Sequence, residues 1–229
     1  MKKLVFLPLL ACFVFSTARS QQHLVDSITR ELQQSMPDTN RAVSMMRLAI
    51  DYELVDTAKA YKAYQEAIRF AASKKLNYNL GRIYQNLAVL YGTSANYTQS
   101  IACLDTAIKN YQQSNHPRAV KMLASAYNDI AGKYKTINDT EESVQYYLKG
   151  IALLEKTESA ADLVTPYCNI ANLFGDIGDP KRQNEYAYKA LAAAKKTGTA
   201  QKIFMACFTL ANAYIHTQQD NPVMAKKYI

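Results

Sequence analysis

Residues 85–91 read QNLAVLY, with an aliphatic residue third, alanine fourth and an aromatic residue seventh. The same pattern recurs in MRLAIDY (46–52), NDIAGKY (128–134), CNIANLF (168–174) and FTLANAY (208–214). These three positions lie along one stripe of an α-helix, so each stretch is predicted to be a helix with one buried face. The stretches begin 39, 43, 40 and 40 residues apart. A fixed period of this length is typical of stacked repeats, none of which can bury its apolar face alone.

A second marker keeps nearly the same period as the first. Residues that favour the N-cap of a helix stand where a second helix should begin in each repeat, at Asp56, Asn96, Asp139, Asp179 and Asp220. Eleven residues after the first four of them, a small residue precedes a larger aliphatic one, in Ala67–Ile68, Ala107–Ile108, Gly150–Ile151 and Ala190–Leu191. A small residue there lets the two helices of a hairpin approach closely. Each repeat is therefore predicted to be a helical hairpin.

This helix-turn-helix pattern resembles the tetratricopeptide repeat (TPR). Residues at the signature positions of that family are Leu87, Ala88, Tyr91, Ser100, Leu104 and Ala107 in the second repeat, and Ile130, Ala131, Tyr134, Ser143, Tyr147 and Gly150 in the third. The chain departs from the family in its longer period, in its lack of tryptophan and in the missing proline at the repeat end. The resemblance implies an all-α fold, a right-handed superhelical solenoid of antiparallel helix pairs with about five TPR-like repeats of ~40 residues.

The two markers also set the expected boundaries. Residues 21–37 are predicted to form an N-terminal capping helix, and the repeats are expected at approximately 38–76, 77–117, 118–160, 161–200 and 201–229. The fifth repeat is incomplete, because its second helix would begin only at Asp220 and would leave an apolar edge at Val223, Met224, Ala225 and Ile229. We expect the chain to be the N-terminal part of a longer protein. The alternative is a natural terminus that frays or pairs with another copy.

The first 20 residues have the features of an export signal. Lys2 and Lys3 precede an apolar stretch over residues 4–15, and small residues flank Arg19 before a predicted cleavage site after Ser20. The apolar stretch is shorter than the ~20 residues of a membrane span. We therefore expect an exported, periplasmic protein. The alternative is a lipoprotein acylated on Cys12, which is disfavoured because the apolar core before Cys12 is short and no polar tether follows it.

The charge of the chain argues against a nucleic acid partner, and its cysteines are expected to be structural. The net charge of +8 falls to +5 once Lys2, Lys3 and Arg19 leave with the signal, and the remaining lysine pairs are distributed along the chain. We therefore expect no nucleic acid partner, which would require a basic patch on one face. Three cysteines remain, at Cys103, Cys168 and Cys207. They are predicted to be small buried hydrophobic residues, and a Cys168–Cys207 disulfide is the alternative.

The sequence contains no catalytic constellation. His23, His116 and His216 are scattered, without the spacing or the acidic partners of a metal site. The chain also lacks a glycine-rich phosphate loop, a GxSxG elbow and the signature motifs of a kinase. We therefore expect no catalytic residue, no metal site and no cofactor in the residues present.

The TPR resemblance instead implies a binding surface. In that family the first helix of each repeat lines a concave groove, whose ligand is usually an extended peptide or a partner helix. Carried onto this chain, the resemblance implies partner-binding residues at Arg82, Gln85, Val89, Ser125, Asn128, Lys135, Thr165, Asn172, Asn212 and His216. Asparagine and glutamine side chains can both donate to and accept from a peptide backbone. The alternative is a solvated inner face without a specific ligand.

An exported TPR-like array is similar to the extracytoplasmic sensor segment of certain bacterial histidine kinases and helix-turn-helix regulators. The phrases DTNR (38–41) and NIAN (169–172) carry this resemblance. It implies a protein or peptide partner, and membrane anchoring and an output module encoded beyond Ile229. The pattern predicts no particular oligomeric state. The alternatives are a periplasmic scaffold or adaptor without signalling output, and the accessory domain of an exported enzyme.

Overall fold

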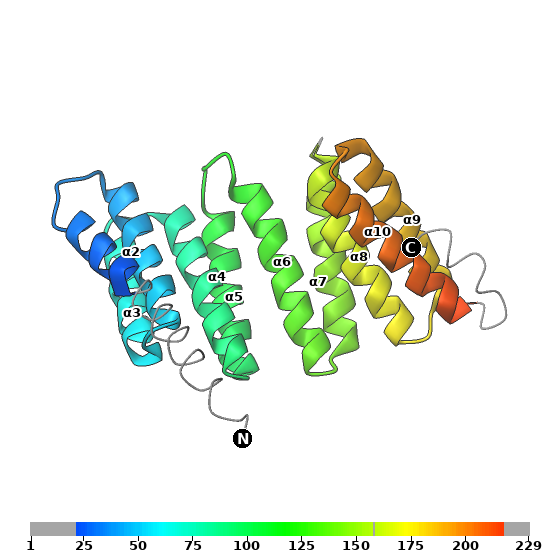
Figure 1. The fold of residues 1–229 in the computed structure, drawn as a ribbon, viewed down its shortest axis with the longest axis horizontal. Helices are drawn as coiled ribbons and strands as arrows, with labels where there is room; N and C mark the ends of the chain where they lie inside the picture. Colours follow the sequence, from blue (N-terminus) through cyan, green and yellow to red (C-terminus); the bar gives the residue numbers. More distant parts are fainter. Residues whose placement is uncertain (1–21, 158, 218–229) are drawn as a thin grey trace, which may run out of the picture. The chain divides into compact units, whose positions relative to one another are not determined.

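A computed structural model describes residues 22–157 and 159–217, and all regular structure in these residues is helical. A helix over residues 22–31 comes first. It is followed by α2 (Asp38–Glu53), α3 (Thr57–Ser73), α4 (Asn77–Thr93), α5 (Tyr97–Gln112), α6 (Ala119–Thr136), α7 (Thr140–Leu154), α8 (Ala160–Asp176), α9 (Pro180–Thr197) and α10 (Ala200–Thr217) (Figure 1). Successive helices pack as antiparallel pairs joined by short turns. The predicted all-α fold of paired helices is confirmed.

Side-chain caps start the second helix of each described hairpin. The carboxylates of Asp56, Asp139 and Asp179 and the amide oxygen of Asn96 each accept a hydrogen bond from the backbone N–H three residues further on. These bonds satisfy backbone donors that have no partner within the helix. The hydrogen bond from the backbone N–H of Arg182 is the main cause that lowers the pKa of Asp179. The four predicted caps are confirmed, whereas Asp220 lies outside the described residues.

The turns inside three of the hairpins share one backbone conformation. The residue before the cap has a positive φ, which is 55° at Ala95, 61° at Asn138 and 73° at Gly178. The cap residue then donates its backbone N–H to the carbonyl of the aromatic residue that ends the repeated sequence pattern. In the second hairpin, for example, the N–H of Asn96 lies 2.9 Å from the carbonyl oxygen of Tyr91. The first helix of each of these hairpins ends two residues after the aromatic residue, and this hydrogen bond closes its C-terminal turn.

The chain forms two compact units, and the first comprises residues 1–114. Its described part contains the helix over 22–31 and the hairpins α2–α3 and α4–α5. In the second hairpin, Gly81 of α4 faces the ring of Tyr111, and the hydroxyl of Tyr111 donates to the side-chain oxygen of Gln85 at 2.8 Å. The hydroxyl of Ser100 donates to the carbonyl of Ala88 at 2.6 Å. Buried hydrogen bonds of this kind fix how the two helices pair.

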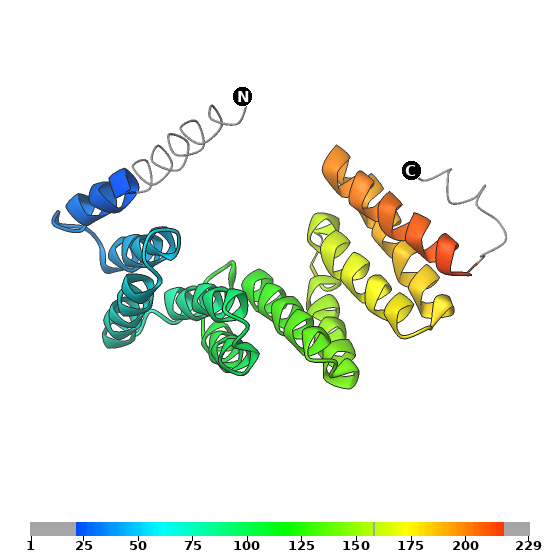
Figure 2. The ribbon, with the colours of Figure 1, turned by 60° about the horizontal axis from the view of Figure 1, so that its bottom comes forward.

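The second unit comprises residues 115–229 and contains α6–α7, α8–α9 and α10. Figures 1 and 2 both show α8 and α9 side by side along their length, with α10 packed against them. The hydroxyl of Ser143 donates to the carbonyl of Ala131, as Ser100 does in the first unit. A Cβ atom placed on Gly150 would lie 3.1 Å from the carbonyl oxygen of Ala124, so the predicted close approach at this small residue is confirmed.

The three cysteines of the described residues are unpaired thiols. Cys103 and Cys168 are buried, as predicted, whereas Cys207 is half-buried. Burial raises the pKa of the Cys103 thiol to about 11, so it stays protonated at neutral pH. A protonated thiol is a poor nucleophile. Because Cys168 and Cys207 are both free thiols, the alternative of a Cys168–Cys207 disulfide is wrong for this structure.

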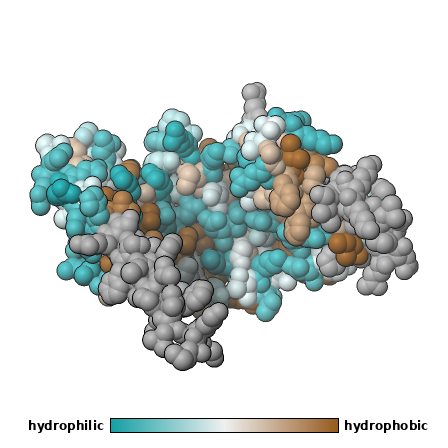
Figure 3. All heavy atoms as spheres, in the orientation of Figure 1, coloured by the Kyte–Doolittle hydropathy of each residue, from teal (hydrophilic) through white to brown (hydrophobic). Residues whose placement is uncertain are grey.

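Apolar side chains are exposed along α10. Phe204 is 67% exposed and Phe208 is 54% exposed, and their rings stack at 6.4 Å between centroids. Figure 3 shows apolar atoms gathered over this helix. The apolar residues that the sequence analysis assigned to the edge after Asp220 lie outside the described residues. Among the helices that the structure describes, none is both long and apolar enough to span a bilayer.

Candidate functional site

Polar side chains join α6 to α8 at regular intervals. Lys121 Nζ lies 2.6 Å from Oδ1 of Asp162, and Lys135 Nζ lies 2.6 Å from Oδ2 of Asp176. Midway between these ion pairs, Nδ2 of Asn169 donates to Oδ1 of Asn128 at 3.0 Å. We call these three contacts the rungs of the α6–α8 seam. They are seven residues apart on both helices, which is close to two helical turns, so the same two helix faces meet at every rung.

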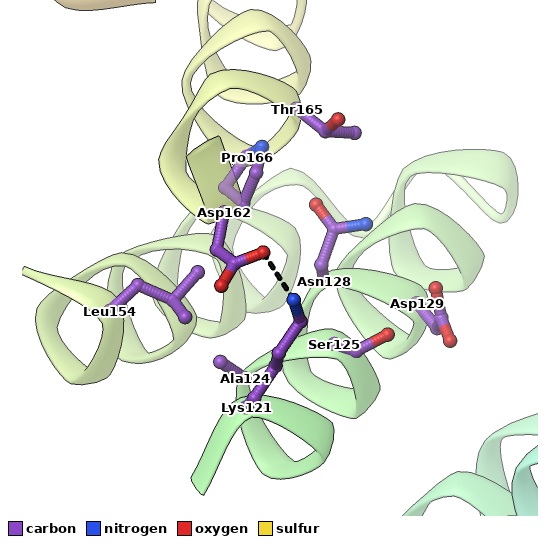
Figure 4. A pocket seen from close by; sticks show the side chains of 9 residues that line it. All are labelled: Lys121, Ala124, Ser125, Asn128, Asp129, Leu154, Asp162, Thr165 and Pro166. Carbon is purple, nitrogen blue, oxygen red and sulfur yellow. Dashed lines mark ion pairs between the residues drawn. The ribbon is translucent and has the colours of Figure 1, made fainter. Parts of the chain in front are cut away.

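A pocket of about 320 Å³ lies between the first and second rungs (Figure 4). Its lining residues come from three helices. They are Lys121, Ala124, Ser125, Asn128 and Asp129 of α6, Leu154 of α7, and Asp162, Thr165 and Pro166 of α8. The structure thus brings together three of the residues that the TPR resemblance implied, namely Ser125, Asn128 and Thr165.

The pocket combines an apolar floor with a polar rim. Ala124, Leu154 and Pro166 are buried, whereas Thr165 is exposed. Pro166 lies inside α8 and has no backbone N–H, so the carbonyl of Asp162, four residues earlier, lacks its helical donor. An extended peptide carries N–H donors, carbonyl acceptors and side chains in regular alternation. The pocket therefore offers partners for the peptide backbone beside a space for one apolar side chain.

The first rung carries a stable charge pair. Burial alone would raise the pKa of Asp162, but hydrogen bonds from Lys121 and Ser159 and the charges of Lys121 and Lys202 outweigh burial and lower it. Asp162 is therefore ionised at neutral pH. Lys202 of α10 also donates to the carbonyl of Ala161 at 2.5 Å, which fixes α10 to the start of α8.

Three further predicted residues of the second unit lie outside the pocket. Lys135 forms the third rung, and Asn172 of α8 and Asn212 of α10 are half-buried. The fourth, His216, lies near the end of α10, and its side chain is outside the described residues. The resemblance thus implied two residues of the rungs themselves, Asn128 and Lys135.

The three predicted residues of the first unit lie on α4 in different environments. Val89 is 50% exposed, and the guanidinium of Arg82 lies 6.0 Å from the ring centre of Tyr78. Gln85 is only 8% exposed, and its side-chain oxygen accepts the hydroxyl of Tyr111. Gln85 therefore lies in the interior of the α4–α5 hairpin instead of on an open face. The physical reason is that Tyr111 extends over Gly81, where no side chain blocks it.

Sequence reasoning missed eight residues of the seam and its pocket. They are Lys121, Ala124, Asp129, Leu154, Asp162, Pro166, Asn169 and Asp176. A signal for the missed seam residues was present. Lys121 stands seven residues before the predicted Asn128, which stands seven before the predicted Lys135, and the complementary Asp162, Asn169 and Asp176 each follow 41 positions later. Leu154 and Pro166 carried no such signal, since either could belong to an ordinary helical core.

The described residues hold no arrangement suited to metal chemistry. Within residues 22–157 and 159–217, no group of three His, Cys, Asp or Glu side chains is placed to hold a metal ion. The polar groups of the pocket are hydrogen-bonding and ion-pairing groups, which suit recognition of a ligand.

Comparisons with known proteins place the fold. Residues 81–114 match the family model described as tetratricopeptide repeat. A search of curated proteins finds no match. Among solved structures, BtubC (BKLC) from P. vanneervenii is similar at 19% sequence identity and a TM-score of 0.75, over 93% of this chain and 86% of that chain.

Two further solved structures share the fold. Nearly identical TPR-like repeats of a Podosopora anserina protein align at 17% identity and a TM-score of 0.64, over 85% of this chain and 93% of that chain. The apo form of RapI aligns at 14% identity and a TM-score of 0.69, over 82% of this chain and 67% of that chain. TPR-like folds present extended surfaces for protein–protein interaction. The chain thus carries a tetratricopeptide repeat at residues 81–114 and has the helical-hairpin fold of TPR-like proteins.

Proposed function

We propose that this chain is a protein-interaction module that binds an extended peptide or protein segment at the α6–α8 seam. The observation that carries the proposal is the pocket between the first two rungs, with its apolar floor and its polar rim. The ligand backbone would bond to the amide of Asn128 and the hydroxyl of Thr165, and one apolar side chain would occupy the space above Leu154. Ligands that follow the seam would then reach Lys135 and Asn172.

The proposal is tested with peptides selected for binding to the wild-type chain from a random library. Thr165→Ala and Asn128→Ala should each weaken binding of the selected peptides by about 1–3 kcal/mol, because a partner in the pocket loses a hydrogen bond. A matched control is the pair Thr106→Ala and Asn110→Ala on α5, which removes the same groups in the first unit. Equal affinity of the pocket variants and the control variant would contradict the proposal.

The proposed setting is outside the cytoplasm. The features of residues 1–20 support export with cleavage after Ser20, and the TPR-like repeats suit the sensor segment of a bacterial histidine kinase or helix-turn-helix regulator. In that setting a bound ligand would separate the paired side chains of the seam and shift an output module between two states.

Expression of the full chain followed by mass spectrometry of the periplasmic fraction tests export. A mature N-terminus at Gln21 supports it, a lipid on Cys12 supports the lipoprotein alternative, and an unprocessed cytoplasmic chain contradicts both.

Two related functions predict the same seam. A periplasmic scaffold or adaptor would bind a partner there without any output module, and an accessory domain would deliver a partner to an enzyme encoded in the same chain. The coding sequence after Ile229 distinguishes these two functions from the sensor function. A membrane span followed by a kinase or DNA-binding module supports the sensor function, whereas a catalytic module or an immediate stop codon contradicts it.

A further inference from the structure

The exposed face of α9 is a basic strip on the second unit. One side of the helix is buried against α8 and α10. On the opposite side, Arg182 and Glu185 are exposed and take part in ion pairs. Six further residues are exposed there, namely Lys181, Tyr188, Lys189, Ala192, Lys195 and Lys196. From Lys181 to Lys196 the strip runs about 22 Å along the helix axis. We call these six residues the α9 strip.

The charge of α9 is unusual among the second helices of the hairpins. α9 contains five cations and one carboxylate, a net charge of +4, whereas α3 carries +2, α5 is neutral and α7 carries −1. The helix dipole favours lysine in the last turn and so accounts for Lys195 and Lys196. It does not account for Lys181, because a cation in the first turn of a helix is disfavoured. The helix dipole therefore explains only the two lysines at the C-terminal end of the strip.

Part of this charge is already engaged within the chain. Arg182 pairs with Asp179 at 2.6 Å and stacks on the ring of Phe174 at 4.2 Å. Lys189 pairs with Glu185 at 2.8 Å. In contrast, Lys181, Lys195 and Lys196 form no ion pair with any carboxylate of the described residues. The charge of Lys181 does act on the carboxylate of Asp179, but without a close ion pair. The three ammonium groups thus lie at both ends of the strip without a close carboxylate partner among the described residues.

We propose that the α9 strip docks an acidic segment of a partner protein. Charge complementarity favours an acidic partner. Tyr188 lies between the lysines with 46% of its surface exposed and its hydroxyl bonded to that of Tyr214, so its ring can anchor an interface. A lipid surface fits less well, because helices that lie on membranes present bulky apolar side chains and the apolar face of α9 is buried within the unit. Single-stranded nucleic acid fits less well, because its binding sites stack successive bases on several aromatic side chains and the strip has one exposed ring, Tyr188.

A binding titration tests this proposal on the full chain. A fluorescein-labelled decaglutamate peptide is titrated at low ionic strength, with a decaglutamine peptide as the neutral reference. The variant Lys181→Gln, Lys195→Gln, Lys196→Gln removes three charges without placing acids at the helix C-terminus. It should bind decaglutamate at least about fivefold more weakly than wild type, since each removed charge weakens association. The change in thermal unfolding temperature shows whether the variant folds.

The matched control is Lys62→Gln, Arg69→Gln, Lys109→Gln, which removes three exposed cations from α3 and α5 of the first unit. It should bind decaglutamate as wild type does. Equal weakening by both variants would overturn the proposal, because net charge alone would then explain binding. Failure of wild type to bind decaglutamate would also overturn it, as would tighter binding to vesicles of equal phosphatidylglycerol and phosphatidylcholine or to a single-stranded oligonucleotide. Thr165→Ala should leave decaglutamate binding unchanged, so this proposal and the seam proposal fail independently.

Discussion

The ammonium group of Lys121 lies 2.6 Å from the carboxylate of Asp162, on the helix that begins the next hairpin of the second unit. The lysine side chain is largely exposed and the aspartate side chain is mostly covered. We predict a coupling free energy of about 0.5–1 kcal/mol in a double-mutant cycle of Lys121→Ala and Asp162→Ala, as for other partly exposed ion pairs. Urea unfolding measures it. High salt should reduce the coupling. A coupling of zero at low salt would contradict a stabilising ion pair between Lys121 and Asp162.

The pKa of Asp162 predicts how this rung responds to acid. Its pKa is lowered in the folded chain, so the unfolded chain binds more protons near the usual pKa of aspartate. The rung therefore stabilises the fold above that pKa, and its contribution is lost as pH falls through the lowered folded value. The urea-unfolding free energy of wild type should drop below about pH 4 more steeply than that of Asp162→Asn. Parallel curves for the two proteins would show that Asp162 titrates alike in both states.

Positive φ angles in the hairpin turns predict opposite effects of two substitutions. Ala95 has φ 55° and Gly178 has φ 73° at equivalent places, and a Cβ on Gly178 would meet no other atom within 4 Å. Only the backbone conformation should matter, so Ala95→Gly should stabilise the fold by about 0.5–1 kcal/mol and Gly178→Ala should destabilise it by about 1 kcal/mol. Chemical denaturation measures both. Changes of the same sign would contradict this account of the turn.

Two glycines inside helices provide a matched test of the packing. A Cβ on Gly81 would lie 2.5 Å from the ring of Tyr111, whose hydroxyl is fixed by Gln85. Gly81→Ala should therefore destabilise the fold by about 1–3 kcal/mol through overpacking. At Gly132 the nearest atom is the Tyr147 hydroxyl at 3.8 Å, so Gly132→Ala should stabilise the helix by about 0.5–1 kcal/mol. Equal effects at the two sites would show that Tyr111 does not pack as described.

The sequence predicts the hairpins better than it predicts the site. Short-range signals decide where the helices begin, so residue type and spacing suffice to place the caps at Asp56, Asn96, Asp139 and Asp179. The seam depends instead on the register between two helices whose contacts lie 41 positions apart. A shift of one residue would separate Asn128 from Asn169.

The burial of Gln85 also depends on packing between helices, which the sequence pattern does not reveal. Helical periodicity places it at the edge of the buried stripe, where its exposure depends on the neighbouring helix. The size of Tyr111 and the absence of a side chain at Gly81 decide that it is buried. Both facts concern packing between α4 and α5, which the periodicity of one helix does not contain.

Amide hydrogen exchange of the full chain, with and without a library-selected peptide, tests most directly whether a partner binds at the α6–α8 seam. The account predicts that bound peptide slows exchange in segments that contain residues 121–129 and 160–166, and that Thr165→Ala abolishes this protection. The same peptide should leave exchange along α3 unchanged. Protection confined to the first unit, or binding without any protection of α6 and α8, would contradict the account.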